Sequence, residues 1–298
     1  MEKGDHPELD STDLLDELGT RQYQSLIGAM QWAVSIGRID ITTAVMTMSG
    51  FRVAPRKGHL ERVKRIYGYL SYMRHAAIRA RTGEPNYSDL PAQNFDWAHS
   101  VYGDAEGLLP LNAPEPLGKF VTLTDYVDAN LYHDLLTGRS VTGCLHLMNK
   151  TPIDWHSRKQ ATVETATFGS ESVAARTCID QAIDLRITLR YLGVPIRGSY
   201  MFGDNESVVN SSIHPHAKLH KRHTALSFHR VREAIAAKIV LFYHIPGVLN
   251  VADILSKHWG YQQVREILRP LLFYHGDTYN ILLEPPKGNK PTTKAATA

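Results

Sequence analysis

The sequence predicts an α/β domain preceded by a small helical domain, and three observations lead to this fold class. The 298 residues are enough for one large or two ordinary domains. Between residues 23 and 81, hydrophobic side chains recur at steps of three and four, which is the spacing of amphipathic helices. From residue 119 onward, strand-like alternation, as in FVTLTDYVDA, is interleaved with helical spacing.

Composition excludes several classes of protein. With 43% hydrophobic and 21% charged residues, the chain is typical of soluble globular proteins, so overall disorder is not expected. No apolar run approaches the roughly 20 residues that cross a bilayer, and the acidic start MEKGDHPELDSTDLLDELG lacks the apolar core of a secretory signal. Cys144 and Cys178 are too few for a disulfide framework and fit a reducing compartment. We expect an intracellular protein that is neither secreted nor in a membrane.

Changes in composition divide the chain into five segments. They are an acidic lead-in (1–20) expected to be disordered, a helical basic region (21–82), a Pro- and Gly-rich connection (83–118), the α/β domain (119–262) and a C-terminal extension (263–298) expected to be disordered at its end. In the α/β domain, we expect strands at FVTLTDYVDA, GCLHLMN, TPIDWHS, SYMFGD and IVLFYHIP. Helices are expected at Ser170–Tyr191, at HTALSFHRVREAIAAK and from VADILSKHW onward.

The helical region is strongly basic. Nine Lys and Arg residues lie between Arg52 and Arg81 with Glu61 as the only acid, and three tyrosines are interleaved among them. A basic face with aromatic rings suits a phosphate backbone and stacked bases, whereas the alternative is a solvated helical face. The candidate nucleic-acid-binding residues on this face are Arg62, Lys64 and Arg65.

Four acids stand where strands are expected to end or helices to begin: Asp128, Glu171, Asp204 and Asp253. Carboxylates at such positions can point into one cleft of an α/β sheet. Together they would repel one another unless a cation neutralised them, and Mg²⁺ prefers such oxygen ligands. Because the chain has 30 Asp and Glu residues, spacing alone does not separate this set from ordinary surface acids.

Several motifs in order resemble a known family. The motifs VDANLYHDLLTGRSVTG, PIDWHSRKQATVE, FGSESVAA, MFGDNESVV, KRHTALSFHRVRE and NVADILSKHWG resemble the ribonuclease H domain of Ty1/copia-type retrotransposon Pol polyproteins. The upstream stretches YQSLIGAMQWAVSIGRIDITTAVMTMSG and HLERVKRIYGYL resemble the thumb-like segment between the polymerase and ribonuclease H parts of those polyproteins. The resemblance spans roughly residues 21–262 and implies a ribonuclease H-like fold with a five-stranded mixed sheet flanked by helices.

The resemblance also implies an activity. All four family metal ligands are matched by the acids named above, which implies two Mg²⁺ ions, with Mn²⁺ as an alternative, and hydrolysis of the RNA strand of RNA–DNA hybrids. The implied partners are the hybrid and the rest of a Pol polyprotein, and the implied location is a cytoplasmic virus-like particle or the nucleus. YVDA resembles the polymerase motif YVDD, but Ala129 replaces its second acid, so no polymerase site is expected.

Further residues are candidates for substrate contacts, each with a structural alternative. Arg158 and Lys159 could meet a phosphate, and Asn205 could contact the minor groove of the hybrid or cap a helix. His223 matches a family histidine and could touch the substrate or serve in packing. The sequence departs from the family at Gly169, where an acid is usual, although this position is outside the catalytic four.

Two alternatives to an RNA–DNA hybrid ribonuclease stay open at this level. One is a catalytically silent nucleic-acid-binding or assembly module derived from a retrotransposon, which the missing polymerase site favours and the intact four acids oppose. The other is a different member of the same fold, namely a DNA exonuclease, resolvase or transposase, which the motifs outside the four acids oppose.

Overall fold

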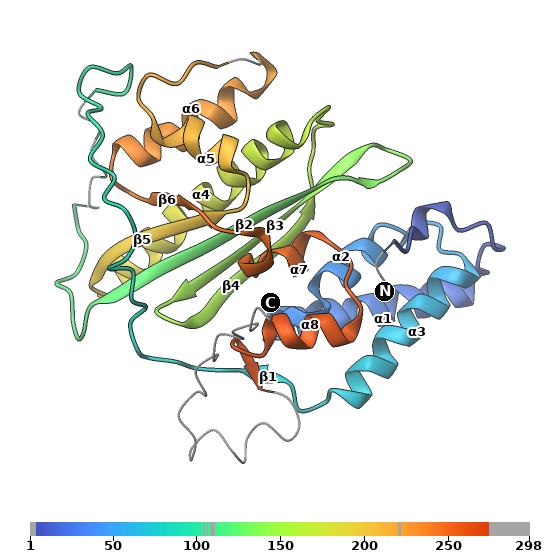
Figure 1. Ribbon diagram of the computed structural model, residues 1–298. Helices are drawn as coiled ribbons and strands as arrows, with labels where there is room; N and C mark the ends of the chain where they lie inside the picture. The colour runs from blue at the N-terminus through green and yellow to red at the C-terminus, as the bar shows by residue number, and fades with distance from the viewer. Residues whose placement is uncertain (1–3, 104, 106, 108–110, 220–221, 274–298) are drawn as a thin grey trace, which may run out of the picture.

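The computed structural model describes residues 4–103, 105, 107, 111–219 and 222–273. It contains a five-stranded mixed sheet with helices on both faces (Figure 1). The sheet order is β4-β3-β2-β5-β6, formed by β2 (Val121–Asp134), β3 (Arg139–Met148), β4 (Thr151–Lys159), β5 (Ile196–Gly203) and β6 (Leu241–His244). The β2, β3 and β4 strands pair antiparallel, whereas β5 runs parallel to both β2 and β6. The predicted ribonuclease H-like arrangement is confirmed.

One face of the sheet is covered by three helices (Figure 1). They are α4 (Thr167–Tyr191), α5 (Glu206–Ile213) and α6 (Ala225–Ala236). Small side chains of α4, such as Ala174 and Cys178, lie against Val127 and Met201 of the central strands in one buried cluster. The α4 helix therefore packs closely on β2 and β5, the strands that position Asp128 and Asp204.

The opposite face of the sheet is covered by α7 (Asp253–Ser256) and α8 (Tyr261–Leu268), with α2 (Thr42–Ser49) of the helical region beside β4 (Figure 1). The other helices of this region, α1 (Glu17–Ser35) and α3 (Lys57–Tyr72), pack with α2 around a separate core that includes Tyr23, Met48 and Val63. Leu145 of β3, Leu255 of α7 and Ile39 before α2 share one hydrophobic cluster, and Thr43 donates a hydrogen bond to the backbone oxygen of Ile254 at 2.6 Å. A short sheet of β1 (Ala77–Ile78) and β7 (Leu272–Phe273) adds a second connection. The two parts are thus joined through a shared core.

The acidic lead-in differs from its prediction. From residue 4 onward it has a defined path along α3, including a 3-10 helix at Pro7–Leu9, and α1 already begins at Glu17. The path follows from charge, because Asp13 pairs with Lys57 at 2.8 Å and Asp10 pairs with Arg62 at 2.6 Å. Acids that suggested disorder in the sequence instead neutralise the neighbouring basic helix.

The Pro- and Gly-rich connection is mostly irregular and runs past the β5–β6 edge of the sheet (Figure 1). Gln93 donates to the backbone oxygen of Phe242 at 2.6 Å, and Tyr243 donates to that of Pro91 at 3.1 Å. The predicted disordered end of the C-terminal extension lies outside the described residues. Among the described helices, none has the length and hydrophobicity that a membrane span requires.

Candidate active site

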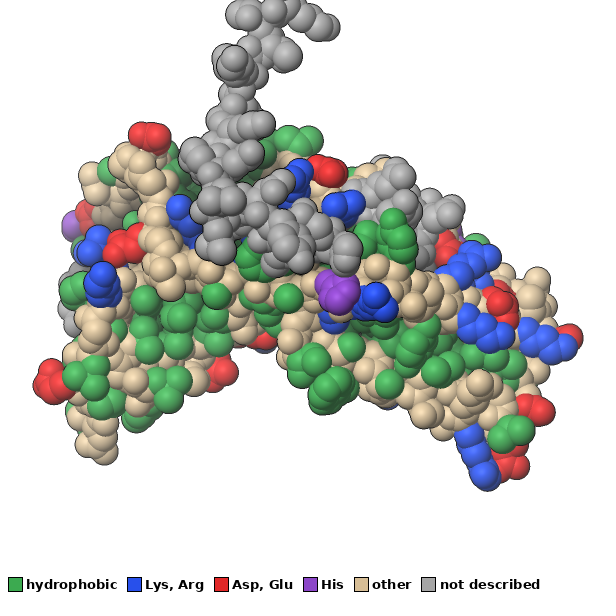
Figure 2. Space-filling model, turned by 90° about the horizontal axis from the view of Figure 1, so that it is seen from below, with side chains coloured by type: hydrophobic (Ala, Val, Ile, Leu, Met, Phe, Trp, Pro, Cys, Tyr) green, Lys and Arg blue, Asp and Glu red, His purple; other side chains and the backbone are tan. Residues whose placement is uncertain are grey.

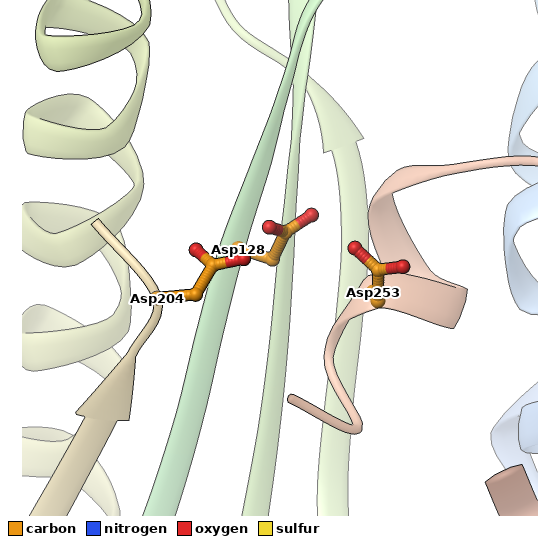
Figure 3. A group of neighbouring side chains, drawn as sticks. All are labelled: Asp128, Asp204 and Asp253. Atoms are coloured by element: carbon orange, nitrogen blue, oxygen red, sulfur yellow. The ribbon is translucent and has the colours of Figure 1, made fainter. Parts of the chain in front are cut away.

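Three of the four predicted acids meet beside the middle of β2. The prediction that Asp128 ends a strand is wrong, because β2 continues in its ladder with β3 as far as Asp134. Asp128 lies on β2, Asp204 directly follows β5 and Asp253 opens α7 (Figure 3). Each offers a carboxylate oxygen, and these three oxygens lie within 4.8 Å of one another. Parallel pairing explains the first contact, because Tyr126 is in register with Phe202 and the two strands reach Asp128 and Asp204 two residues later.

A glycine in β3 allows α7 to approach the sheet and bring Asp253 close to Asp128. Gly143 is directly opposite Asp128 in the β2–β3 ladder. A Cβ atom at position 143 would lie 2.8 Å from the backbone oxygen of Ala252, so any side chain there would push α7 off the sheet. Asn250 fixes the preceding loop, because its Nδ2 donates to the backbone oxygen of Val127 at 2.9 Å. The RSVTG motif therefore serves the site through close packing.

Glu171 lies beside the three aspartates without joining the group within 4.8 Å. It is buried in the first turns of α4, and burial, followed by the negative charges of Asp128 and Asp204, raises its pKa well above the usual value. Gln160 ties this end of α4 to the sheet, because its Nε2 donates to the backbone oxygen of Ser170 at 2.8 Å. The prediction of four neighbouring acids thus resolves into three clustered aspartates and an adjacent glutamate.

Burial also dominates the electrostatics of Asp128. Its side chain is 1% exposed, and burial, reinforced by the charges of Asp253 and Asp204, raises its pKa to about 6 despite the attraction of Lys257. The hydroxyl of Ser256 donates to Oδ2 of Asp128. Three hard oxygen donors from three separate elements form a set that fits a divalent cation such as Mg²⁺.

Lys257 is a site residue that the sequence reasoning missed. Its Nζ lies 3.3 Å from Oδ2 of Asp128 and also pairs with Oδ1 of Asp253. The available signal was the spacing in ADILSK, which places the lysine four residues after the aspartate. A lysine at that spacing is usually a surface partner, so only the folded structure distinguishes this one.

The predicted basic face of α3 is only partly free. Arg62 pairs with Asp5 at 2.9 Å and with Asp10 at 2.6 Å, so the acidic lead-in already occupies its guanidinium. Lys64 is exposed and pairs with Glu61 at 2.7 Å. Figure 2 shows Lys and Arg side chains gathered over the helical region with Asp and Glu side chains among them.

Arg65 borders a cleft between the helical region and α7–α8. The cleft has a volume of about 1080 Å³, and Tyr69, Lys257 and Trp259 also line it. Arg65 is exposed, so its charge can face a ligand in this cleft. Lys257 lines the cleft and also pairs with Asp128 and Asp253, so it connects the cleft to the acidic cluster, although none of the three aspartates lines the cleft itself.

The remaining candidates are spread around the α/β domain. Arg158 is exposed on β4, whereas Lys159 pairs with Asp134 at 2.6 Å. Asn205 caps α5, since its side chain accepts a hydrogen bond from the backbone NH of Val208 at 3.1 Å.

His223 lies next to the carboxylate of Glu164, which is also close to Gly169. Its Nε2 is 3.2 Å from Oε2 of Glu164, whose carboxylate occupies the space that a side chain at position 169 would need. The Glu164 carboxylate therefore fills the space beside Gly169.

The chain is similar to Pol polyproteins of plant retrotransposons. No family model matches it. It is 26% identical over 235 residues to the Pol polyprotein of transposon TNT 1-94 from Nicotiana tabacum, and 23% identical over 237 residues to that of transposon RE1 from Arabidopsis thaliana. Each match covers 79% of this chain but only 15% and 14% of the respective polyprotein. A 24% identical match over 168 residues, 56% of this chain, covers 94% of secreted RxLR effector protein 161 from Plasmopara viticola.

Solved structures similar to this chain include ribonuclease H domains. The N-terminal RNase H domain of a Mycobacterium tuberculosis protein is 12% identical, with a TM-score of 0.37 over 50% of this chain and 97% of that domain. By its strand order and flanking helices, the chain has a ribonuclease H-like fold. Its homologues are Pol polyproteins of Ty1/copia-type retrotransposons, and it spans about one seventh of their length.

Proposed function

We propose that this chain hydrolyses the RNA strand of RNA–DNA hybrids in a divalent-metal-dependent reaction, as part of a Ty1/copia-type reverse transcriptase and ribonuclease H. The observation that carries the proposal is the convergence of Asp128, Asp204 and Asp253 within 4.8 Å, with Glu171 beside them. Homology to Pol polyproteins over 79% of the chain supports the same role.

The acidic residues are proposed to hold two Mg²⁺ ions, with Mn²⁺ as the alternative. When bound, such ions activate the attacking water and stabilise the leaving oxygen of the scissile phosphate. Asp128 is held for this task by the Ser256 hydroxyl, while Gly143 and Asn250 keep α7 close enough for Asp253 to take part. Rigid placement of ligands from three elements is what gives such a site its precision.

The hybrid is proposed to lie along the cleft beside α3. Lys64 and Arg65 would bind backbone phosphates there, and Arg158 would do so at the β4 side. The amide nitrogen of Asn205, whose oxygen caps α5, can donate to the minor groove next to Asp204. His223 and Lys159 hold carboxylates and would act on the substrate only indirectly.

The YVDA motif at residues 126–129 does not support a polymerase active site. Ala129, which replaces the second acid, is 4% exposed and packs in the hydrophobic cluster under α4. The compartment, which we expect to be a virus-like particle or the nucleus, stays a prediction.

A cleavage assay tests the proposal. The purified chain is incubated with matched RNA·DNA, RNA·RNA and DNA·DNA duplexes, with Mg²⁺ or with EDTA, and only the RNA strand of the hybrid should be cut, and only with metal. Asp184 is exposed on α4, so Asp184→Asn is a matched control for Asp128→Asn. Binding of the hybrid without cleavage by the parent chain would favour the silent binding module instead.

A further inference from the structure

The ammonium group of Lys257 lies among the candidate metal ligands. The residue follows α7 directly, and its side chain is 35% exposed. Its Nζ is 3.3 Å from Oδ2 and 3.4 Å from Oδ1 of Asp128, and it also pairs with Oδ1 of Asp253. One cationic group therefore contacts two of the three clustered aspartates.

These contacts offset a repulsion that the fold itself creates. The buried carboxylate of Asp128 is held close to those of Asp204 and Asp253, and like charges in a buried site destabilise one another. A nearby ammonium lowers this cost, as the attraction of Lys257 for both Asp128 and Asp253 indicates. A divalent cation would need the same oxygens.

We propose that Lys257 is the internal counter-ion of Asp128 and Asp253 and competes with the divalent cation for their carboxylate oxygens. The proposal rests on the metal-dependent function proposed above. Lysine is suited to this role because its charge sits on a flexible four-carbon stem that can withdraw without moving the backbone. Lys257 also lines the cleft beside Arg65, so a displaced ammonium can pair with a substrate phosphate there.

The test compares the full chain with Lys257→Met, which keeps the length of the stem and removes the charge. We expect the variant to have a lower melting temperature in EDTA and about tenfold tighter binding of Mn²⁺ in calorimetric titration, equivalent to about 1.4 kcal/mol. Lys257→Arg, which keeps the charge, should bind Mn²⁺ about as weakly as the parent. Lys150→Met removes an exposed lysine in the turn between β3 and β4, to which no role is assigned, and should change neither quantity.

NMR of the parent chain gives a second test, which holds even if Lys257→Met does not fold. In the parent chain, the side-chain NMR signal of Lys257, assigned with the Arg variant, should move toward that of a free lysine as Mg²⁺ is added. Unchanged or weaker metal binding by Lys257→Met, a Lys257 signal that Mg²⁺ does not move, or no metal binding by any variant would overturn the proposal. Because none of these measurements uses a nucleic acid, failure to cut the hybrid would refute the proposed function and leave the counter-ion role intact.

Discussion

Asp128→Asn is expected to make the metal-free protein more stable above pH 6 while abolishing RNA cleavage. Burial, with the charges of Asp253 and Asp204, raises the pKa of Asp128 from 3.8 to about 6. Between these two pH values the folded chain binds more protons than the unfolded chain, so the stability of the parent falls as the pH rises through this window. The asparagine has no charge to lose and avoids this cost.

The magnitude follows from the same pKa. The difference between 3.8 and about 6 corresponds to about 3 kcal/mol in the free energy of unfolding. The Asn variant should therefore match the parent below pH 4 and exceed it by up to about 3 kcal/mol at pH 8. Cleavage should fall by orders of magnitude, because a neutral amide is a poor ligand for a hard cation.

Urea unfolding followed by circular dichroism, in EDTA at pH 4, 6 and 8, measures this difference. Asp184→Asn should show no gain at any pH, because Asp184 is exposed on α4. A variant that is less stable than the parent at pH 8, or a difference that does not change with pH, would refute the electrostatic reasoning. Undiminished cleavage by Asp128→Asn would refute its catalytic role.

Three further outcomes are expected. His146 is buried against Asp125 at 2.7 Å, and although burial lowers its pKa, this hydrogen bond and neighbouring charges raise it to about 10. The stabilisation from this pair should be complete below about pH 6.5 and should be lost as the pH rises through about 10. In urea unfolding, the free energy of unfolding should therefore fall less steeply at alkaline pH in His146→Gln than in the parent. Gly143→Ala should lower the free energy of unfolding by about 1–3 kcal/mol and remove most of the cleavage activity, because its Cβ would push α7 and Asp253 outward. A thermal melt that matches the parent would contradict this. Lys64→Glu with Arg65→Glu should lower the log–log salt slope of hybrid binding by about 0.9 for each lost phosphate contact, and an unchanged slope would assign this face to solvation.

The local sequence determined the element types and the positions of the acids. Alternating and helical spacing predicted the sheet and its long helix, and short motifs correctly placed Asp204 after a strand and Asp253 at a helix start, whereas Asp128 lies within β2. These features depend on residues near one another in the chain, so they can be read without knowing the fold. The same reasoning also identified the basic composition of α3.

The tertiary structure decided which charges meet. Lys257 pairs with Asp128 across more than a hundred residues, and the acidic lead-in, expected to be disordered, pairs with α3 and occupies Arg62. Gly143 permits the approach of α7 only because β3 lies directly beneath that helix. Local spacing carries no information on such contacts, because they arise when separate elements pack on a common sheet. The sequence therefore determined the acids and the basic helix, whereas packing decided that Lys257 pairs with the acids and that the lead-in pairs with α3.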